Sequence, residues 1–383
     1  MSDFDLSRRN MMIASSVATA LAANTAANAA ANTADGSKPA LNMRGDGSYD
    51  TVPLAKPSWS LGIAQTRVRP VDATTEASAR KGRLENLDHM LGLIDAAQGY
   101  GGAKDLLFFH EFPITGWSSK WDKAAALRAA ITLPGEETAA IAKKCREYNC
   151  WIVFGSYVRD PDWPGHLLSI TTVMDNTGKI VAKDWKARNI VGVFQGFELF
   201  TTTIHNVLDR YIEMYGVDEV VPVIRTPLGN LAVTSTQREP LLMTAMAMKG
   251  AEVFLRTATG GFSPIDMQST SFYNGVYTAV VNNAISPGIG TFFEAAGGGG
   301  SALYGPRGEV VAKADTQMEE LVSAAIPIAS FRERHRQPNI HMDLMLPVFE
   351  AYRSQQPPNM FAPKSPDNGA DAMQFLANKS RWK

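Results

Sequence analysis

The chain has 383 residues, of which 45% are hydrophobic and 20% are charged, and its formal net charge at pH 7 is −1. This composition is ordinary for a globular protein with a full-sized core, and the balanced charge disfavours a protein that binds nucleic acid through phosphate contacts. No apolar run reaches the roughly 18 residues that a membrane-spanning helix needs. The two cysteines, Cys145 and Cys150, and the spacing of the six histidines give little support for a metal site. We therefore expect neither a metal nor an organic cofactor.

The first residues have the order of an export signal. Arg8 and Arg9 precede a weakly apolar stretch at residues 13–21, and the Ala-rich stretch at residues 22–34 offers small-x-small cleavage sites. This pattern resembles a twin-arginine signal, which implies a periplasmic mature protein with no membrane association after export. The alternative is a disordered Ala-rich tail with an accidental arginine pair.

Composition divides the chain into four parts. Residues 1–34 form the predicted signal peptide, and residues 35–58, rich in Gly, Ser, Pro and Asn, are expected to form a linker that need not be ordered. Residues 59–330 form the predicted domain. Residues 331–383 form a C-terminal extension rich in Arg, Gln, Pro and Met, which we expect to wrap the body or a partner subunit.

Strands and helices alternate along the predicted domain. Short apolar runs predict buried strands, and apolar residues at helical spacing, such as Leu87, Met90 and Ile94, predict helices. Strands are expected at residues 60–66, 105–109, 151–157, 231–235, 252–256 and 278–282, helices at residues 79–97, 134–148 and 240–249, and hairpins at residues 169–184 and 301–311. This alternation indicates an α/β or mixed layered sandwich.

Several local sequences resemble the nitrilase (carbon–nitrogen hydrolase) superfamily, and they occur in the order of that family. Residues 106–117 (LLFFHEFPITGW) are similar to the strand that carries the family's general base, and residues 178–188 (GKIVAKDWKAR) to its catalytic lysine segment. Residues 226–231 and 240–253 resemble the segments on either side of its nucleophile elbow. Residues 298–311 resemble its late Gly-x-Ser hairpin. The resemblance spans about residues 59–328, and it implies a four-layer α-β-β-α sandwich.

The resemblance assigns roles to individual residues. Glu111 takes the position of the general base, and Lys186 that of the cation which stabilises the oxyanion, although Lys183 competes for this role from the same segment. Such a pair serves a reaction in which a carboxylate activates a nucleophile beside a developing negative charge. Glu198 is a candidate for a second, assisting glutamate by position alone. His110 stands where the family usually has a proline before its base.

The sequence departs from the family at the nucleophile. The family has a cysteine seven residues after the glycine that corresponds to Gly229, and here that position is Thr236, beside Ser235. The acidic residue expected two positions later is Arg238, and Glu239 is one place out of register. A hydroxyl is a poorer nucleophile than a thiol at neutral pH, so Thr236 needs a well-placed base.

The two cysteines do not offer a substitute for this nucleophile. Cys145 and Cys150 both lie before the lysine segment in the sequence. They fall at a predicted helix end and a predicted strand start, where buried thiols are favoured over a disulfide.

Three functional interpretations follow from the resemblance and the departure. The first is a divergent amidase-like hydrolase acting on a non-peptide carbon–nitrogen bond, in which Thr236 or Ser235 attacks or Glu111 activates water. The second is a catalytically inactive nitrilase-fold protein that binds a small amide or carboxylate, and the third is an assembly role. We expect a small amide or nitrile-like substrate. We also expect a homodimer or higher homo-oligomer that packs through helical faces, with the C-terminal tail crossing the interface.

Overall fold

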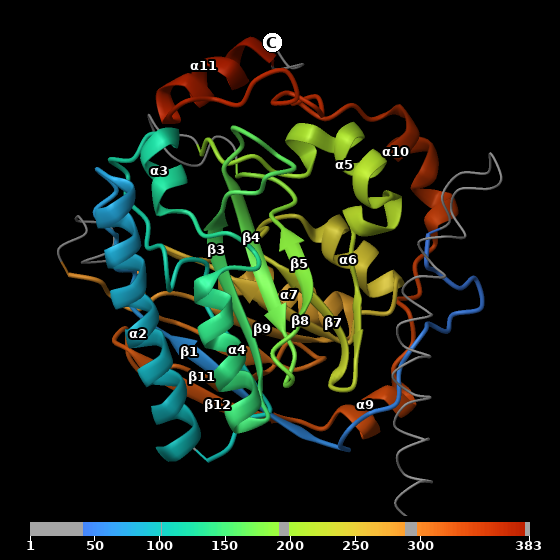
Figure 1. Ribbon diagram of the computed structural model, residues 1–383. Helices are drawn as coiled ribbons and strands as arrows, with labels where there is room; N and C mark the ends of the chain where they lie inside the picture. Colours follow the sequence, from blue (N-terminus) through green and yellow to red (C-terminus); the bar gives the residue numbers. More distant parts are fainter. Residues whose placement is uncertain (1–40, 101, 191–198, 288–296, 380–383) are drawn as a thin grey trace, which may run out of the picture.

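The computed structural model describes residues 41–100, 102–190, 199–287 and 297–379 (Figure 1). The predicted signal peptide at residues 1–34 and the candidate residue Glu198 lie outside the described residues.

Within these ranges the strands form two six-stranded sheets. The strands are β1 (Trp59–Gln65), β2 (Leu106–Phe109), β3 (Trp151–Val158), β4 (Leu168–Met174), β5 (Ile180–Trp185), β6 (Ile224–Thr226), β7 (Gly229–Thr234), β8 (Val253–Thr257), β9 (Tyr277–Val281), β10 (Ala302–Tyr304), β11 (Val310–Lys313) and β12 (Glu320–Ile326). The first sheet has the order β12-β1-β2-β3-β4-β5, and the second has the order β11-β10-β9-β8-β7-β6.

The two sheets place the ends of their parallel strands together. In the first sheet β1, β2 and β3 run parallel, and in the second sheet β7, β8 and β9 do so. The carboxyl ends of parallel strands meet at one edge of a sheet. A hydrogen bond from Ala284 N, after β9, to Thr66 O, after β1, joins these edges at 2.8 Å. Loops that follow strands of both sheets therefore meet at one end of the molecule.

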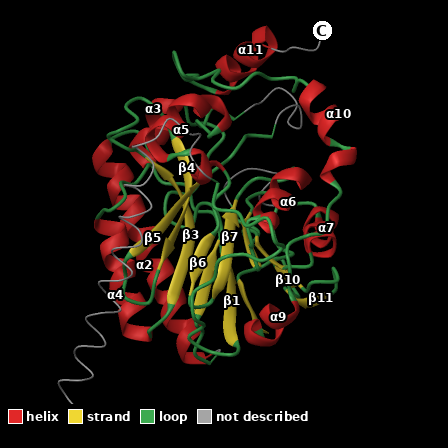
Figure 2. Ribbon diagram, turned by 90° about the vertical axis from the view of Figure 1, so that its right-hand side faces the viewer, coloured by secondary structure: helices red, strands yellow, loops and turns green. Residues whose placement is uncertain are grey.

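Helices cover the outer face of each sheet. The helices are α2 (Glu76–Tyr100), α3 (Lys123–Ala129), α4 (Glu136–Tyr148), α5 (Leu208–Tyr215), α6 (Pro240–Met248), α7 (Pro264–Asn274), α9 (Ile328–Arg334), α10 (Leu346–Ala351) and α11 (Gly369–Lys379), with 3₁₀ turns at His205–Val207, Val217–Val220 and Met342–Leu344. α2 and α4 lie on the first sheet, and α6 and α7 lie on the second (Figure 2). The predicted four-layer α-β-β-α sandwich is confirmed. No described helix combines the length and apolarity needed to cross a membrane.

The alternation of side chains along the strands builds two separate apolar layers. Phe108 of β2 points into the space between the sheets, where it joins Val233 of β7 and Leu255 of β8. Its neighbour Phe109 points the other way, toward Ile94 of α2. These side chains are all at most 1% exposed. Successive residues of a strand face opposite sides of the sheet, so one short strand contributes to both layers.

The described part of the predicted linker, residues 41–58, is attached to the domain. Ala55 N donates a hydrogen bond to Pro227 O at 2.9 Å. Asn230 Nδ2 donates to Asp50 O at 2.8 Å, and Arg332 Nη1 donates to Val52 O at 2.9 Å. This segment therefore lies along the body, since side chains from distant parts of the chain bind its backbone.

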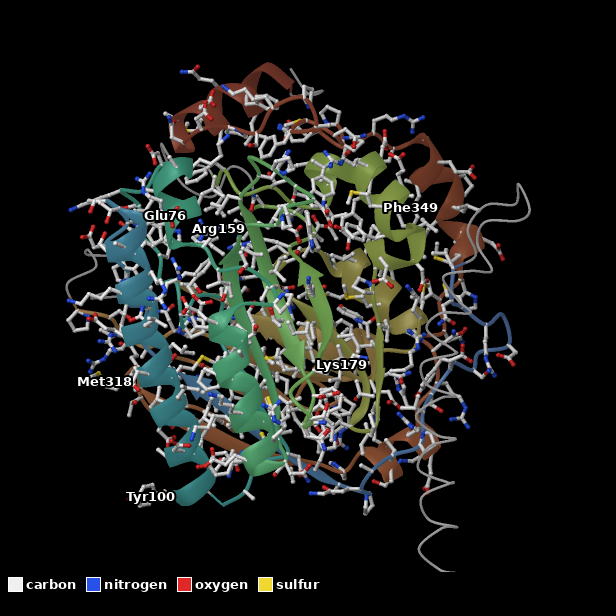
Figure 3. The ribbon with its side chains drawn as sticks, viewed as in Figure 1. Glu76, Tyr100, Arg159, Lys179, Met318 and Phe349 are labelled. Carbon is white, nitrogen blue, oxygen red and sulfur yellow. The ribbon has the colours of Figure 1, made fainter. Side chains whose placement is uncertain are left out.

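The C-terminal extension runs along the edge of the sandwich and ends at α11, beside α3 (Figure 1). Lys123 at the start of α3 forms an ion pair with Asp367 at 2.8 Å. Ala372 of α11 is fully buried in an apolar cluster that includes Phe112. Phe349 of α10, between these attachments and α9, is 40% exposed at the edge of the molecule (Figure 3). Much of the extension thus packs on its own chain.

Candidate active site

Glu111 lies just after the end of β2, in a position that β3 fixes. Gly155 N of β3 donates a hydrogen bond to His110 O at 3.0 Å. A Cβ atom at Gly155 would lie 2.5 Å from Glu111 Cα, so the close approach of the two backbones requires glycine. Glu111 as a whole residue is only 6% exposed. The carboxylate is therefore held at the edge of the first sheet by backbone packing.

Lys186 follows β5 and forms an ion pair with Glu111, with Nζ and Oε1 3.3 Å apart. The two side chains are 12% and 8% exposed. Lys183, the competing lysine, is an exposed residue whose Nζ donates to Leu133 O at 3.0 Å. The geometry thus brings Lys186, and not Lys183, to the candidate base.

Thr236 lies on the turn between β7 and α6, residues 235–239, which we call the β7–α6 turn. Ala187 N, which follows Lys186, donates a hydrogen bond to Thr236 Oγ1 at 3.2 Å. Thr236 N donates to Thr234 Oγ1 at 3.1 Å. Thr236 is 1% exposed and Ser235 is 6% exposed. The threonine therefore lies against the segment that carries the lysine.

Two arginines hold the β7–α6 turn from different elements. Arg188 Nη2 donates to Arg238 O at 3.2 Å, and its guanidinium also forms an ion pair with Glu239. Arg256 Nη2 of β8 donates to Thr236 O at 2.8 Å. Arg238 has a φ of +56°, a left-handed conformation that costs a residue with a side chain about 1–2 kcal/mol. The turn is therefore strained, and charged side chains stabilise it.

His110 is fully buried next to the candidate base. Its Nδ1 accepts a hydrogen bond from Phe112 N at 3.1 Å. Burial lowers the pKa of His110 to about 4, so the ring is neutral at physiological pH. Tyr157 of β3 is also buried, and burial, followed by the charge of Glu111, raises the pKa of its hydroxyl. Neither group therefore adds a positive charge next to Glu111.

The two cysteines lie in the apolar layer between the first sheet and its helices. Cys145 of α4 and Cys150 before β3 are both free thiols with no exposed surface. Burial raises the pKa of each thiol to about 12. A thiol that stays protonated is a poor nucleophile, so neither cysteine has the properties of an activated one.

Among the described residues, no group of three or more His, Cys, Asp or Glu side chains could hold a metal ion. The candidate site is instead a buried carboxylate and a buried ammonium beside a turn with two hydroxyl side chains. This arrangement can transfer a proton and stabilise a developing negative charge.

The structure brings Glu111, Lys186 and Thr236 to one place and puts Ser235 on the same turn as Thr236. It adds residues that the sequence analysis does not single out, namely Arg188, Arg256 and Asp266, whose Oδ2 accepts a hydrogen bond from Arg238 N of the turn. A charged residue inside an otherwise apolar strand pattern, Val253–Thr257, is the one feature of the sequence that could have pointed to Arg256.

The fold and this site define a hydrolase-like α-β-β-α protein. A comparison with known protein families identifies its family. The carbon–nitrogen hydrolase family model matches residues 78–336, which is more than half of the chain. The chain therefore belongs to the carbon–nitrogen hydrolase family, within the nitrilase superfamily.

Solved structures share the fold at low sequence identity. A carbon–nitrogen hydrolase from Helicobacter pylori G27 is 17% identical, with a TM-score of 0.55 over 77% of this chain and 95% of the other. An amidase of the nitrilase superfamily from Nesterenkonia AN1 is 16% identical, with a TM-score of 0.53 over 77% and 99% of the two chains. At this identity the similarity shows the fold alone.

Curated relatives match over a shorter region. The bifunctional nitrilase/nitrile hydratase NIT4B of Lupinus angustifolius is 29% identical over 129 residues, 33% of this chain and 31% of the relative. The corresponding NIT4A protein of Nicotiana tabacum is 30% identical over the same length. The match thus spans about a third of the length of these relatives.

Proposed function

We propose that the protein hydrolyses the carbon–nitrogen bond of a small, non-peptide amide, with Glu111 as the general base and Lys186 stabilising the oxyanion. The observation that carries this proposal is the buried Glu111–Lys186 ion pair beside the β7–α6 turn. Removing two charges from water costs several kcal/mol for each ion. A pocket that only binds a neutral amide has less need of that pair than one that transfers a proton.

In the covalent version of the reaction, Thr236 is the nucleophile. Glu111 takes the proton of the hydroxyl as Thr236 Oγ1 bonds to the amide carbon, and Lys186 stabilises the negative oxygen of the tetrahedral intermediate. The carbon–nitrogen bond then breaks, and the proton on Glu111 passes to the leaving amine. Water hydrolyses the resulting ester by the same steps, which release the acid and restore the hydroxyl.

In the direct version, water takes the place of the hydroxyl. Glu111 removes a proton from a water molecule, which attacks the amide carbon, and the same proton passes to the leaving amine. Ser235 is a further hydroxyl on the same turn. The two versions share Glu111 and Lys186 and differ in the nucleophile, so replacing Thr236 distinguishes them.

The solved Nesterenkonia amidase supports the type of bond that we propose, although its active site contains a cysteine. The Nesterenkonia amidase has an active-site cysteine to which acrylamide and the acetamide moiety of fluoroacetamide add. The β7–α6 turn of the present chain has hydroxyl residues and no cysteine. We propose that Thr236 replaces the thiol, within a site that has changed as a unit together with Arg238 and Glu239.

Ligand binding without turnover is the second candidate function. Thr236 is 1% exposed, and its Oγ1 already accepts a hydrogen bond from Ala187 N. A buried hydroxyl of this kind is a weak nucleophile unless the base engages it directly. In that case the site would hold a small amide or carboxylate beside Lys186.

We propose the periplasm as the location and a homodimer or higher homo-oligomer as the assembly. The export-signal pattern at residues 1–34 supports the location. The exposed apolar side chains of Leu241 on α6 and of Ile265 and Phe272 on α7 support association through the helices on the second sheet.

The test is release of ammonia or amine from a broad panel of amides and nitriles by the purified chain. Glu111→Gln is expected to lower kcat by a factor of at least about 10² because it removes the base. Lys186→Ala is expected to lower it by about 10²–10³ because it removes a charge from the oxyanion. Thr236→Ala abolishes turnover in the covalent version and retains it in the direct version.

Lys183→Ala is the matched control, since this lysine lies in the same segment and points to Leu133 O. It is expected to keep the activity of the unchanged protein. If no compound is hydrolysed but some of them raise the melting temperature, the hydrolase proposal is wrong and ligand binding takes its place.

A further inference from the structure

Arg256 is a buried charge whose contacts lead to the candidate site. It lies on β8, is 1% exposed, and forms an ion pair with Asp266 of α7, with Nη2 and Oδ2 2.8 Å apart. The same Nη2 donates to Thr236 O at 2.8 Å, and Nη1 donates to Thr270 Oγ1 at 3.0 Å. One guanidinium thus joins a strand, a helix and the β7–α6 turn.

Asp266 contacts the same turn independently. Its Oδ2 accepts a hydrogen bond from Arg238 N at 3.0 Å as well as the bond from Arg256. The pair therefore binds the carbonyl of Thr236 and the amide of Arg238, which lie on either side of Gln237. The backbone on both sides of Gln237 is fixed by charged groups that belong to β8 and α7.

The direction of the Thr236 carbonyl determines the direction of the next amide. In a planar trans peptide, the C=O and the following N–H point in opposite directions. Because Thr236 O points to Arg256, the N–H of Gln237 points away from the guanidinium. No described residue accepts a hydrogen bond from Gln237 N. The bond from the cation to the carbonyl also polarises the peptide, which makes this N–H a stronger donor.

The contacts of Arg256 are not those of a pair arranged for stability alone. Its Nε is buried without a hydrogen-bond partner among the described residues. An unsatisfied buried donor costs about 1–3 kcal/mol. Nη2, by contrast, is shared between Asp266 and the backbone of the turn. The guanidinium is therefore placed so that Nη2 bonds the turn, while its Nε–H is left without an acceptor.

We propose that Arg256 is a positioning residue that, with Asp266, orients the Thr236–Gln237 peptide so that the Gln237 N–H is available as a second donor to the oxyanion. This inference rests on the proposed function for its catalytic part. Arg256 does not touch the substrate. It acts on the reaction through the direction and the donor strength of one peptide group.

The first measurement is hydrogen exchange of the peptide covering the β7–α6 turn, which needs no turnover. Arg256→Lys keeps the charge but loses the planar fork, so it cannot serve the same three acceptors. We expect faster exchange of the Arg238 amide in this variant. Arg83→Lys is the control because Arg83 is also buried and also bonds a carboxylate and a backbone carbonyl, Glu137 Oε1 and Arg128 O. It should leave the exchange of the turn unchanged.

The second measurement is steady-state kinetics on the best amide. A displaced oxyanion donor acts in the transition state, so Arg256→Lys is expected to lower kcat by about tenfold to a hundredfold with KM nearly unchanged. Asp266→Asn is a milder variant of the same contact and should lower kcat in the same direction. Arg83→Lys should retain kcat.

The outcomes separate this inference from the proposed function. If Arg256→Lys exchanges like Arg83→Lys, or if its kcat is unchanged, Arg256 does not position the turn. A rise in KM at constant kcat also contradicts the proposal, because it would indicate a role in ground-state binding. If the unchanged chain hydrolyses nothing, the proposed function and the catalytic part of this inference both fail. Hydrogen exchange then still decides whether Arg256 fixes the turn.

Discussion

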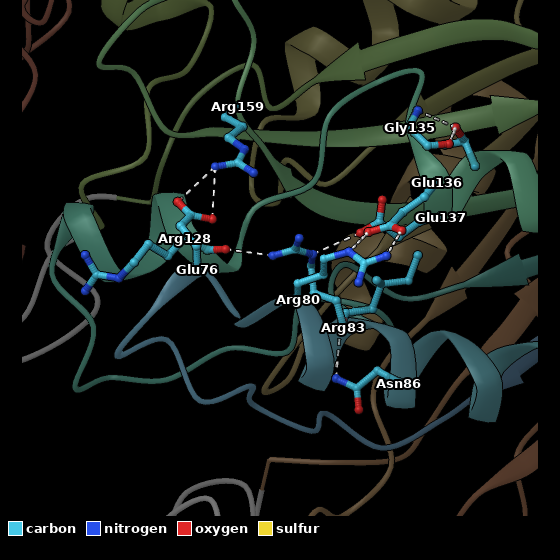
Figure 4. Close-up of polar contacts among 11 residues, drawn as sticks. Glu76, Arg80, Arg83, Asn86, Arg128, Gly135, Glu136, Glu137 and Arg159 are labelled. Carbon is cyan, nitrogen blue, oxygen red and sulfur yellow. Dashed lines mark hydrogen bonds and ion pairs between the residues drawn. The ribbon is translucent and has the colours of Figure 1, made fainter. Parts of the chain in front are cut away.

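Two buried arginine–carboxylate pairs lie in opposite layers of the sandwich. One joins helices to one another, and the other joins a strand and a helix to the β7–α6 turn. Arg83 of α2 bonds Glu137 of α4 through Nε at 2.9 Å and Arg128 O of α3 through Nη1 at 2.7 Å (Figure 4). It therefore joins three helices. Arg256 joins a strand and a helix to a strained turn.

The comparison teaches that a buried ion pair does not by itself mark a functional site. Both pairs are almost fully buried, with side-chain exposures of 6% and 3% for Arg83 and Glu137 and of 1% and 12% for Arg256 and Asp266. What differs is the third partner of each arginine. For Arg83 it is the end of a helix, and for Arg256 it is the peptide next to Thr236.

The largest expected effect comes from removing one partner of each pair. Glu137→Ala leaves the charge of Arg83 buried and unpaired, which should lower the free energy of unfolding by about 3–5 kcal/mol. Asp266→Ala should destabilise the protein in the same way. Urea unfolding measures both changes, and kcat is measured on the folded fraction.

Of these two variants, only the one that contacts the β7–α6 turn is expected to change kcat. Asp266→Ala should lower kcat, whereas folded Glu137→Ala should keep it. Equal values of kcat for the two variants would remove the distinction between the pairs.

A smaller effect is expected from the glycine that lets β3 approach Glu111. Gly155→Ala forces a shift of the backbone around Glu111, because the new Cβ would lie 2.5 Å from Glu111 Cα. Overpacking of this kind costs about 1–3 kcal/mol, and the shift should also lower kcat. Thermal unfolding and turnover of the best amide measure the two effects.

Gly92 of α2 provides the matched control, because nothing lies within 4 Å of a Cβ built there. Gly92→Ala should stabilise the protein by about 0.5–1 kcal/mol, since glycine is unfavourable inside a helix. A destabilised but fully active Gly155→Ala would show that the position of Glu111 does not depend on this contact.

Asp184 of β5 is a third buried carboxylate. It differs from Glu137 and Asp266 because, besides burial, the charge that shifts its pKa, that of Glu219, has the same sign as its own. Burial, followed by the charge of Glu219, raises the pKa of Asp184 well above its ordinary value, and its Oδ2 has no partner among the described residues. Tyr211 faces the same group, and Asp184 contributes to the raised pKa of that hydroxyl.

The sign of the pH effect follows from the raised pKa. Between the ordinary pKa and the raised one, the folded protein keeps a proton that the unfolded chain releases. The stability that Asp184 contributes is therefore fully present at acidic pH and is lost as pH rises through the folded pKa. Asp184→Asn should remove this loss, so that the melting temperature of the variant relative to the unchanged protein increases as the pH is raised above the ordinary pKa of about 4. A constant difference across this range would contradict the buried, uncompensated carboxyl.

Most of the central strands can be predicted from sequence because each is a short apolar run. The runs at residues 60–66, 105–109 and 151–157 correspond to β1, β2 and β3 within one residue at each end. The pairing of β1 with β12 is different, since Trp59 pairs with Ile326 across most of the domain. No local pattern encodes a partner at such a distance.

Residues 41–58 show where composition fails to predict structure. Their composition is that of a linker, yet Asn230 and Arg332 bind their backbone carbonyls. Composition reports how little apolar surface a segment can bury, and it does not report hydrogen bonds donated from elsewhere in the fold.

For the site, the family resemblance singles out Glu111, Lys186 and Thr236, and the structure places them together. The resemblance favours Lys186 but leaves Lys183 as a competitor, and the structure separates the two because only Lys186 contacts Glu111 while Lys183 bonds Leu133 O. Arg256 lies inside a predicted strand, and its role depends on Asp266 and on the carbonyl of Thr236, which no spacing along the chain connects.

The C-terminal extension bears on where this protein can be cut. The family match ends at residue 336, and it begins at residue 78, after β1. Ala372, however, is buried in the same cluster as Phe112, the residue that follows Glu111. A fragment trimmed to the family boundaries would lack β1, the strand between β12 and β2 of the first sheet, and would uncover apolar surface next to the candidate base. The unit that folds is thus larger than the unit that sequence families define, and expression of the chain from about residue 41 to its last residue is the appropriate starting point.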